Sequence, residues 1–143
     1  RDGRTAGCHH RAMTKAIPID LNAALAALTP LRNRTPHTTD AERKDAFARV
    51  APYRDGGLFI AAFDGRSAWE RHPVGDELVQ VLEGETDLIL LQDGDEVRHT
   101  LRAGQLIVVP QGTWHRFETA GVRLMTATPQ PTEHLIGEGL PED

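Results

Sequence analysis

The sequence has a single cysteine, fewer basic than acidic residues, and no long hydrophobic run. One cysteine, Cys8, excludes an internal disulfide and is typical of a reducing compartment, so we expect a cytoplasmic protein. No apolar stretch approaches the roughly 18 residues of a membrane-spanning helix, so we expect no membrane partner. The 21 acidic and 16 basic residues give a formal net charge of -5. We therefore expect no nucleic-acid partner, because phosphate binding requires a basic face.

The beginning of the chain lacks a structural pattern. Residues 1–12 are polar, without periodicity and without the apolar segment of a secretory signal. Because Met13 opens a stretch typical of a natural start, we expect residues 1–15 to be a disordered leader or an upstream extension. Three potential metal ligands lie in this segment, namely Cys8, His9 and His10. We interpret them as surface residues rather than as a metal site.

With 143 residues, the chain is long enough for one domain with a real hydrophobic core. Residues 16–43 predict a short helix capped by Asp20, followed by a polar connector over residues 31–39. A helical turn is expected over residues 40–44. Residues 44–143 then predict a β-barrel with a C-terminal tail.

Short alternating or apolar runs, separated by turn residues, fill this second region. The expected strands are residues 47–51, 58–63, 67–72, 77–82, 86–91, 97–101, 106–109, 114–118 and 122–128. Short strands with regular turns and no helices between them predict an all-β sandwich or barrel. From their alternation we expect seven side chains in the core or at a subunit contact: Leu78, Val79, Val81, Leu88, Leu90, Ile107 and Val109.

Two stretches in this region carry the residue types of a metal site. In the first, Glu70 and His72 lie two positions apart, so both can face one side of a strand, and Glu77 begins the next strand. In the second, His115 follows a strand run and a Pro/Gly turn. Imidazole and carboxylate groups are common ligands of divalent metals. Two histidines with one or two carboxylates therefore predict a metal site inside the barrel.

The first stretch resembles the first motif of the cupin superfamily, written G-x5-H-x-H-x3,4-E-x6-G. His72, Glu77 and Gly84 keep the spacing of this motif, and Glu70 stands where the first histidine normally lies. The leading glycine, Gly65, is one residue too close.

The second stretch resembles the second cupin motif, written G-x5-P-x-G-x2-H-x3-N. Gly104, Pro110, Gly112 and His115 all fall in place, and Thr119 replaces the asparagine. The resemblance covers roughly residues 44–128. It implies a double-stranded β-helix, or jelly roll, with a metal commonly held inside the barrel.

For this chain the resemblance implies that His72, Glu77 and His115 bind the metal. Glu70 could be a fourth ligand, a catalytic proton-transfer group, or an exposed acid paired with Arg71. Glu77 could instead orient His72 without binding the metal. A carboxylate oxygen of Glu70 makes the metal-ligand set a harder set of donors than three histidines would be. This favours manganese or iron, and zinc and nickel are also compatible.

Other conspicuous residues are interpreted more simply. Trp69, Trp114 and Phe117 flank the motifs, and we expect core packing or lining of the barrel mouth rather than substrate stacking. The remaining histidines after the leader are expected at the surface rather than as ligands: His37, His99 and His134.

The expected function is that of an enzyme acting on a small polar organic molecule. The resemblance leaves dioxygenase, isomerase and decarboxylase chemistry open, since one fold hosts many activities. The alternative is a non-catalytic module that binds a small ligand or a metal. We also expect a homodimer, because this is common in the family and exposed strand edges need cover.

Overall fold

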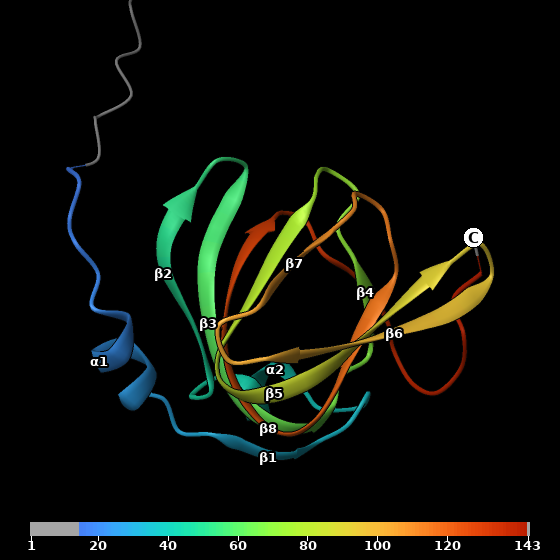
Figure 1. Cartoon of the computed structure of the whole chain (residues 1–143), viewed down its shortest axis with the longest axis horizontal. Helices are drawn as coiled ribbons and strands as arrows, with labels where there is room; N and C mark the ends of the chain where they lie inside the picture. The colour runs from blue at the N-terminus through green and yellow to red at the C-terminus, as the bar shows by residue number, and fades with distance from the viewer. Residues whose placement is uncertain (1–14, 143) are drawn as a thin grey trace, which may run out of the picture.

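The computed structural model describes residues 15–142, and within them the chain forms two short helices and nine strands (Figure 1). In chain order they are α1 (Leu21–Ala26), β1 (Leu31–Arg34), α2 (Asp40–Arg43), β2 (Phe47–Tyr53), β3 (Gly56–Arg66), β4 (Trp69–Arg71), β5 (Glu77–Gln92), β6 (Asp95–Arg102), β7 (Leu106–Val109), β8 (His115–Pro129) and β9 (Glu133–Leu135). Cys8, His9 and His10 lie outside the described residues, as does nearly all of the predicted leader. Neither described helix is long and apolar enough to cross a membrane.

The strands form one sheet that curls around its own interior (Figure 1). Its centre is β8, which pairs antiparallel with β3 along one edge and with β5 along the other. Strands β1 and β2 extend the sheet beyond β3, and β6 and β7 extend it beyond β5. Strand β4 joins the beginning of β8 and carries β9 on its other side. This arrangement confirms the predicted all-β jelly roll with a short N-terminal helix.

Two pairs of predicted strands are each one continuous strand, which corrects the sequence prediction. Strand β5 passes through Gly84, where the sequence predicts a turn, and its register with β8 shifts on both sides of that residue. Gly84 has a φ of +72°, and a Cβ there would collide with the carbonyl oxygen of Gly121 on β8. The structure therefore has a β-bulge at Gly84 where the sequence predicts a reversal of the chain. Glycine tolerates the positive φ, and β8 keeps its hydrogen bonds to β5 on either side. Strand β8 likewise continues through residues 119–121.

Local turn and capping predictions are confirmed. Asp20 caps α1 by accepting a hydrogen bond from the backbone N–H of Ala23 at 3.0 Å. The predicted helical turn is α2, which Thr39 caps. The β5–β6 hairpin turns at Asp93 and Gly94, both with positive φ, as a type I′ two-residue loop requires.

Two segments that lack a strand pattern are strands at the margins of the sheet. The predicted polar connector contains β1, which pairs in parallel with β3. The C-terminal tail contains β9, which pairs with β4. Both pairings join segments far apart in the chain, so no local pattern reveals them. They bring Arg34 and His134 to the interior cavity described below.

The core confirms the predicted alternation of β5. Val79, Val81, Leu88 and Leu90 are buried in the main apolar cluster, together with Val109 of β7. The other two predicted core residues, Leu78 and Ile107, are half-buried.

The aromatic residues beside the motifs pack as predicted. Trp69 and Trp114 are buried against Ile89 on the outer face of the sheet, and Phe117 is buried in the main cluster. Phe117 also lines the cavity, so it contributes to both core and wall.

Candidate metal centre

The fold brings together the four residues that the sequence predicts as metal ligands. Glu70 lies in β4, His72 directly after it, Glu77 at the start of β5 and His115 at the start of β8. Each offers one ligand atom, and these atoms all lie within 4.8 Å of one another. Three of the side chains are buried and Glu70 is nearly so. This four-residue cluster can therefore hold a metal ion.

Strand pairing places Glu70 between two histidines. It lies opposite His115 of β8 and opposite His134 of β9, and directly opposed residues share one face of a sheet. Glu70 Oε1 is 3.4 Å from His115 Nε2, and Glu70 Oε2 is 3.4 Å from His134 Nε2. Glu70 is thus not the exposed partner of Arg71, which pairs with Glu133 instead.

His134 is partly exposed, as expected, but sequence reasoning missed its contact with Glu70. Only the long-range pairing of β9 with β4 creates that contact. The other two described histidines considered above, His37 and His99, are exposed and lie outside the cluster.

Glu77 is held from several sides. Its Oε1 lies 3.2 Å from His115 Nε2, and its Oε2 accepts a hydrogen bond of 2.6 Å from the hydroxyl of Thr128. Thr128 in turn shares a hydrogen bond of 2.6 Å with Thr126, two residues earlier on the same face of β8. These contacts fix the carboxylate toward the two histidines.

His72 leaves one buried nitrogen without a hydrogen bond. Its Nδ1 lies 3.0 Å from the hydroxyl of Thr132. Its Nε2 lies 3.0 Å from Glu77 Oε2, but the two groups are not aligned, and this nitrogen has no hydrogen-bond partner. An unsatisfied buried polar group costs on the order of 1–3 kcal/mol. A metal ion bound at Nε2, with Nδ1–H donating to Thr132, fits this arrangement.

His115 also points a nitrogen at the centre of the cluster. Its Nδ1 lies 2.9 Å from the carbonyl oxygen of Thr113, to which it donates, so its Nε2 faces Glu70 and Glu77. A lone pair there would face two carboxylates, so the site requires a positive charge, either a proton or a metal. Burial alone would lower the pKa of His115, but Glu70 and Glu77 raise it to about 10.

Both carboxylates are held in the ionised form. Burial alone would raise the pKa of Glu70, but His115, His134 and the charge of Arg34 hold it well below its usual range. Burial likewise opposes ionisation of Glu77, yet the contacts with His115 and His72 lower its pKa. Two buried carboxylates with two imidazoles form a donor set suited to a divalent cation.

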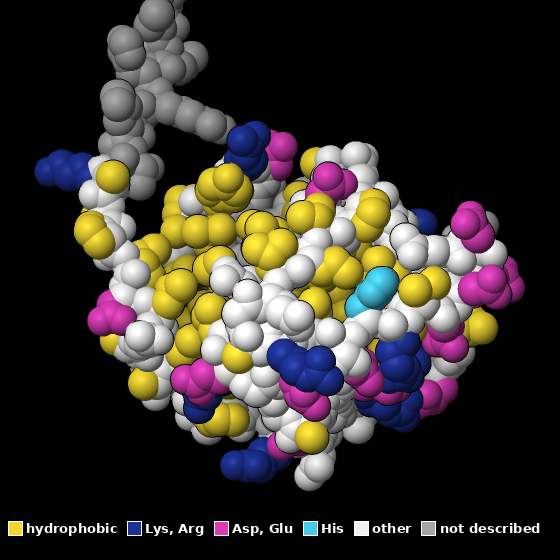
Figure 2. Space-filling model, in the orientation of Figure 1, with side chains coloured by type: hydrophobic (Ala, Val, Ile, Leu, Met, Phe, Trp, Pro, Cys, Tyr) yellow, Lys and Arg dark blue, Asp and Glu magenta, His cyan; other side chains and the backbone are white. Residues whose placement is uncertain are grey.

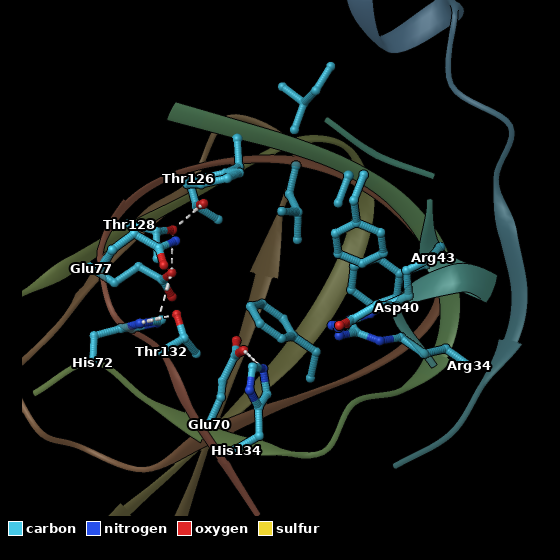
Figure 3. A pocket seen from close by; sticks show the side chains of 18 of the residues that line it. Arg34, Asp40, Arg43, Glu70, His72, Glu77, Thr126, Thr128, Thr132 and His134 are labelled. Carbon is cyan, nitrogen blue, oxygen red and sulfur yellow. Dashed lines mark hydrogen bonds and ion pairs between the residues drawn. The ribbon is translucent and has the colours of Figure 1, made fainter. Parts of the chain in front are cut away.

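A cavity of about 500 Å³ adjoins the cluster, and Glu70, His72 and Glu77 line one side of it (Figure 3). Arg34, Asp40 and Arg43 lie on the other side of this view. Much of the remaining wall is apolar: Phe47, Phe59, Ile60, Phe63, Phe117 and Leu124. Figure 2 shows hydrophobic side chains gathered between β2 and β7, with charged side chains mainly around them. The cavity therefore suits a ligand with both polar and apolar parts.

Comparisons with known proteins agree with this architecture. A family model, Cupin_2, described as a cupin domain, matches residues 58–127. An uncharacterised protein, YdbB of Bacillus subtilis (strain 168), is 30% identical over 89 residues, covering 62% of this chain and 76% of YdbB.

Two solved structures illustrate the likeness in fold. A cupin-2 domain containing protein from Shewanella frigidimarina NCIMB 400 gives a TM-score of 0.57 at 19% identity, covering 82% of this chain and 94% of that one. Hydroquinone 1,2-dioxygenase PnpCD, in complex with Cd2+ and 4-hydroxybenzonitrile, gives 0.52 at 19% identity, covering 58% of this chain and 63% of that one.

Proposed function

The chain belongs to the cupin family, and on that premise we propose that its four-residue cluster binds one divalent metal ion and that the cavity takes a small polar organic molecule as substrate. The observation that carries this proposal is the buried group of two imidazoles and two carboxylates, all within 4.8 Å, beside a cavity of about 500 Å³. The PnpCD neighbour, solved with Cd2+, supports a metal as the first ligand to test.

The proposed ligands are the Nε2 atoms of His72 and His115 with carboxylate oxygens of Glu77 and Glu70. Thr132 and the Thr113 carbonyl orient the imidazoles by accepting from Nδ1. The mixed nitrogen and oxygen set favours manganese or iron, and it also suits zinc or nickel. A bound metal would supply Lewis-acid polarisation of a substrate oxygen.

Glu70 is the proposed proton-transfer residue as well as a ligand. One of its oxygens faces His115 in the cluster, and the other faces His134, which is partly exposed. A proton accepted at the second oxygen could pass to His134 Nε2 and from there to solvent. The reaction type stays open, because isomerisation, decarboxylation and oxygenation can all use a positioned carboxylate.

A second candidate is a metal-free module that binds a small ligand. The observation in its favour is that His115 Nε2 lies 3.4 Å from Glu70 Oε1 and 3.2 Å from Glu77 Oε1, and these carboxylates raise the pKa of His115. A protonated His115 would then supply the positive charge between the two carboxylates, and the cavity would bind its ligand without chemistry.

Metal binding separates the two candidates. Protein purified without an affinity tag would be stripped with chelator and titrated with manganese, iron, zinc and nickel. We expect one ion per chain in the wild type, and binding weakened by roughly 100-fold or more in His72→Ala and His115→Ala, since even outer-sphere partners contribute about 10–100-fold. His99→Ala is the matched control, because His99 is exposed on β6. If no metal binds the wild type, the metal-free module is the better description. If both variants bind like the wild type, the site lies elsewhere.

A further inference from the structure

Arg34 is a buried cation on the side of the cavity away from His72 and Glu77 (Figure 3). It ends β1, where it pairs with Gly65 of β3, and it is 6% exposed. Gly65 has a φ of +97°, and a Cβ there would collide with the Arg34 backbone. The glycine thus permits the close approach that carries this arginine to the cavity.

Among the described residues, the guanidinium of Arg34 has no hydrogen-bond or ion-pair partner, and Glu70 acts on its charge only at longer range. Its Nε is buried without a hydrogen bond, and within residues 15–142 the side chain forms no ion pair. The acidic residue on this side of the cavity, Asp40, pairs with Arg43, and its side chain is 93% exposed. Buried charges in proteins are nearly always paired or hydrogen-bonded, so an unpaired one that lines a cavity calls for an anion.

Two aromatic rings contact the guanidinium of Arg34, but they provide no oxygen acceptor for its N–H groups. Its central carbon lies 4.7 Å from the ring centroid of Phe63 and 5.0 Å from that of Phe47. Such contacts stabilise the positive charge, but an aromatic face is no substitute for the carboxylate oxygens that match the guanidinium fork. Burial lowers the pKa of Arg34 to about 10, so it stays charged at neutral pH.

We propose that Arg34 binds the carboxylate of an amphipathic organic acid, whose apolar body lies against Phe47 and Phe63 and whose other end reaches the four-residue cluster. A carboxylate accepts two parallel hydrogen bonds from a guanidinium and neutralises its single charge. Only the part of this inference that concerns the end of the ligand at the four-residue cluster rests on the proposed function. Binding of the carboxylate at Arg34 does not depend on the metal.

The test compares hydrocinnamate with its neutral amide, hydrocinnamamide, by titration calorimetry. We expect the wild type to bind the acid about tenfold or more tightly than the amide, because hydrogen bonds to charged groups are the strong ones. Arg34→Gln should abolish this preference while leaving the affinity for the amide within about twofold. Arg43→Gln is the matched control: Arg43 lines the same cavity but already pairs with Asp40, so the preference should persist.

Repeating the titrations on His115→Ala separates this inference from the proposed function. If the preference for the acid survives loss of the metal site and disappears in Arg34→Gln, Arg34 is the anion site whether or not a metal binds. If the preference disappears in His115→Ala and persists in Arg34→Gln, the acid binds at the metal centre and the inference is wrong. Equal binding of acid and amide by the wild type would also overturn it.

A second measurement covers the case in which Arg34→Gln does not fold. Arg34→Lys keeps the positive charge but lacks the arginine Nε–H. The resonance that is missing from the nitrogen–proton spectrum of this variant is therefore that of Arg34 Nε–H in the wild type. Hydrocinnamate should shift that resonance in the wild type, and hydrocinnamamide should leave it in place. An Arg34 resonance that does not respond to hydrocinnamate at saturation would overturn the proposal.

Discussion

Glu70 lies between histidines from two neighbouring strands, and each of its carboxylate oxygens faces one of them. A histidine at this position would give the cluster three imidazoles and one carboxylate. The glutamate instead gives two of each, with more negative charge and harder donors. At the scale of single residues, this is where the chain departs from the first cupin motif.

Substitution of Glu70 should change both the strength and the selectivity of metal binding. Glu70→Gln keeps the shape and removes the charge, so we expect affinity for manganese to fall by about tenfold. Glu70→His should raise affinity for zinc or nickel relative to manganese, because imidazole is the softer donor. Metal titration of both variants provides the measurement.

His99→Gln is the matched control for this experiment. His99 is exposed on β6 and lies outside the four-residue cluster, so its loss should leave metal affinity unchanged. Unaltered affinity in Glu70→Gln would mean that Glu70 does not bind the metal and serves proton transfer alone.

The sequence predicts the site residues that lie in the two motifs. It does not predict the cavity residues that are placed there by pairing between distant strands. Glu70 and His72 lie two residues apart, so their shared face follows from the period of a strand. Arg34 and His134 reach the cavity only because β1 and β9 pair with strands distant in the chain. No local pattern in a polar connector or a tail encodes such a pairing.

At the scale of elements, β5 shows which strand properties a sequence predicts. Alternation places Val79 and Val81 on the interior face, and both are fully buried. The same alternation does not reveal that β5 continues through Gly84. The turn residues there are accommodated as a bulge, because β8 pairs with β5 on both sides of the glycine.

The register of β5 can be tested at Val81. This residue pairs with Leu124 of β8 inside the main core, so Val81→Asp would bury an unpaired charge. We expect a loss in the free energy of unfolding on the order of 4 kcal/mol, measured by urea denaturation. The matched control is Val74→Asp in the turn before β5, where the side chain is 47% exposed and the change should stay within about 0.5 kcal/mol. Wild-type stability of Val81→Asp would show that this strand faces the other way.

At the scale of the whole molecule, the curvature of one sheet brings the residues of short sequence motifs together to form a site. The strand ends that carry the four-residue cluster meet on one side of the cavity, and β1 brings a cation to the other. An all-β sandwich or barrel could be predicted, because alternating strands and turn signals are local, and the resemblance to the cupin motifs implied the jelly roll. The cavity could not be predicted, because its wall depends on how far the sheet curls and on which strands at the margins of the sheet close it.

Assembly and location stay predictions of the sequence. Strand β7 pairs with β5 alone among the described strands and exposes Leu106 and Val108. Such an edge fits the expected need for cover by a second copy, and sedimentation velocity would measure the oligomeric state. The expected cytoplasmic location rests on cysteine usage.

The central claim is that a metal ion sits among Glu70, His72, Glu77 and His115. The most direct measurement is anomalous diffraction from crystals of wild-type protein reconstituted with the metal that binds most tightly. We predict one anomalous peak per chain, at bonding distance from the Nε2 atoms of both histidines. A protein that carries one metal per chain by elemental analysis but shows its anomalous peak away from these four side chains would contradict the claim.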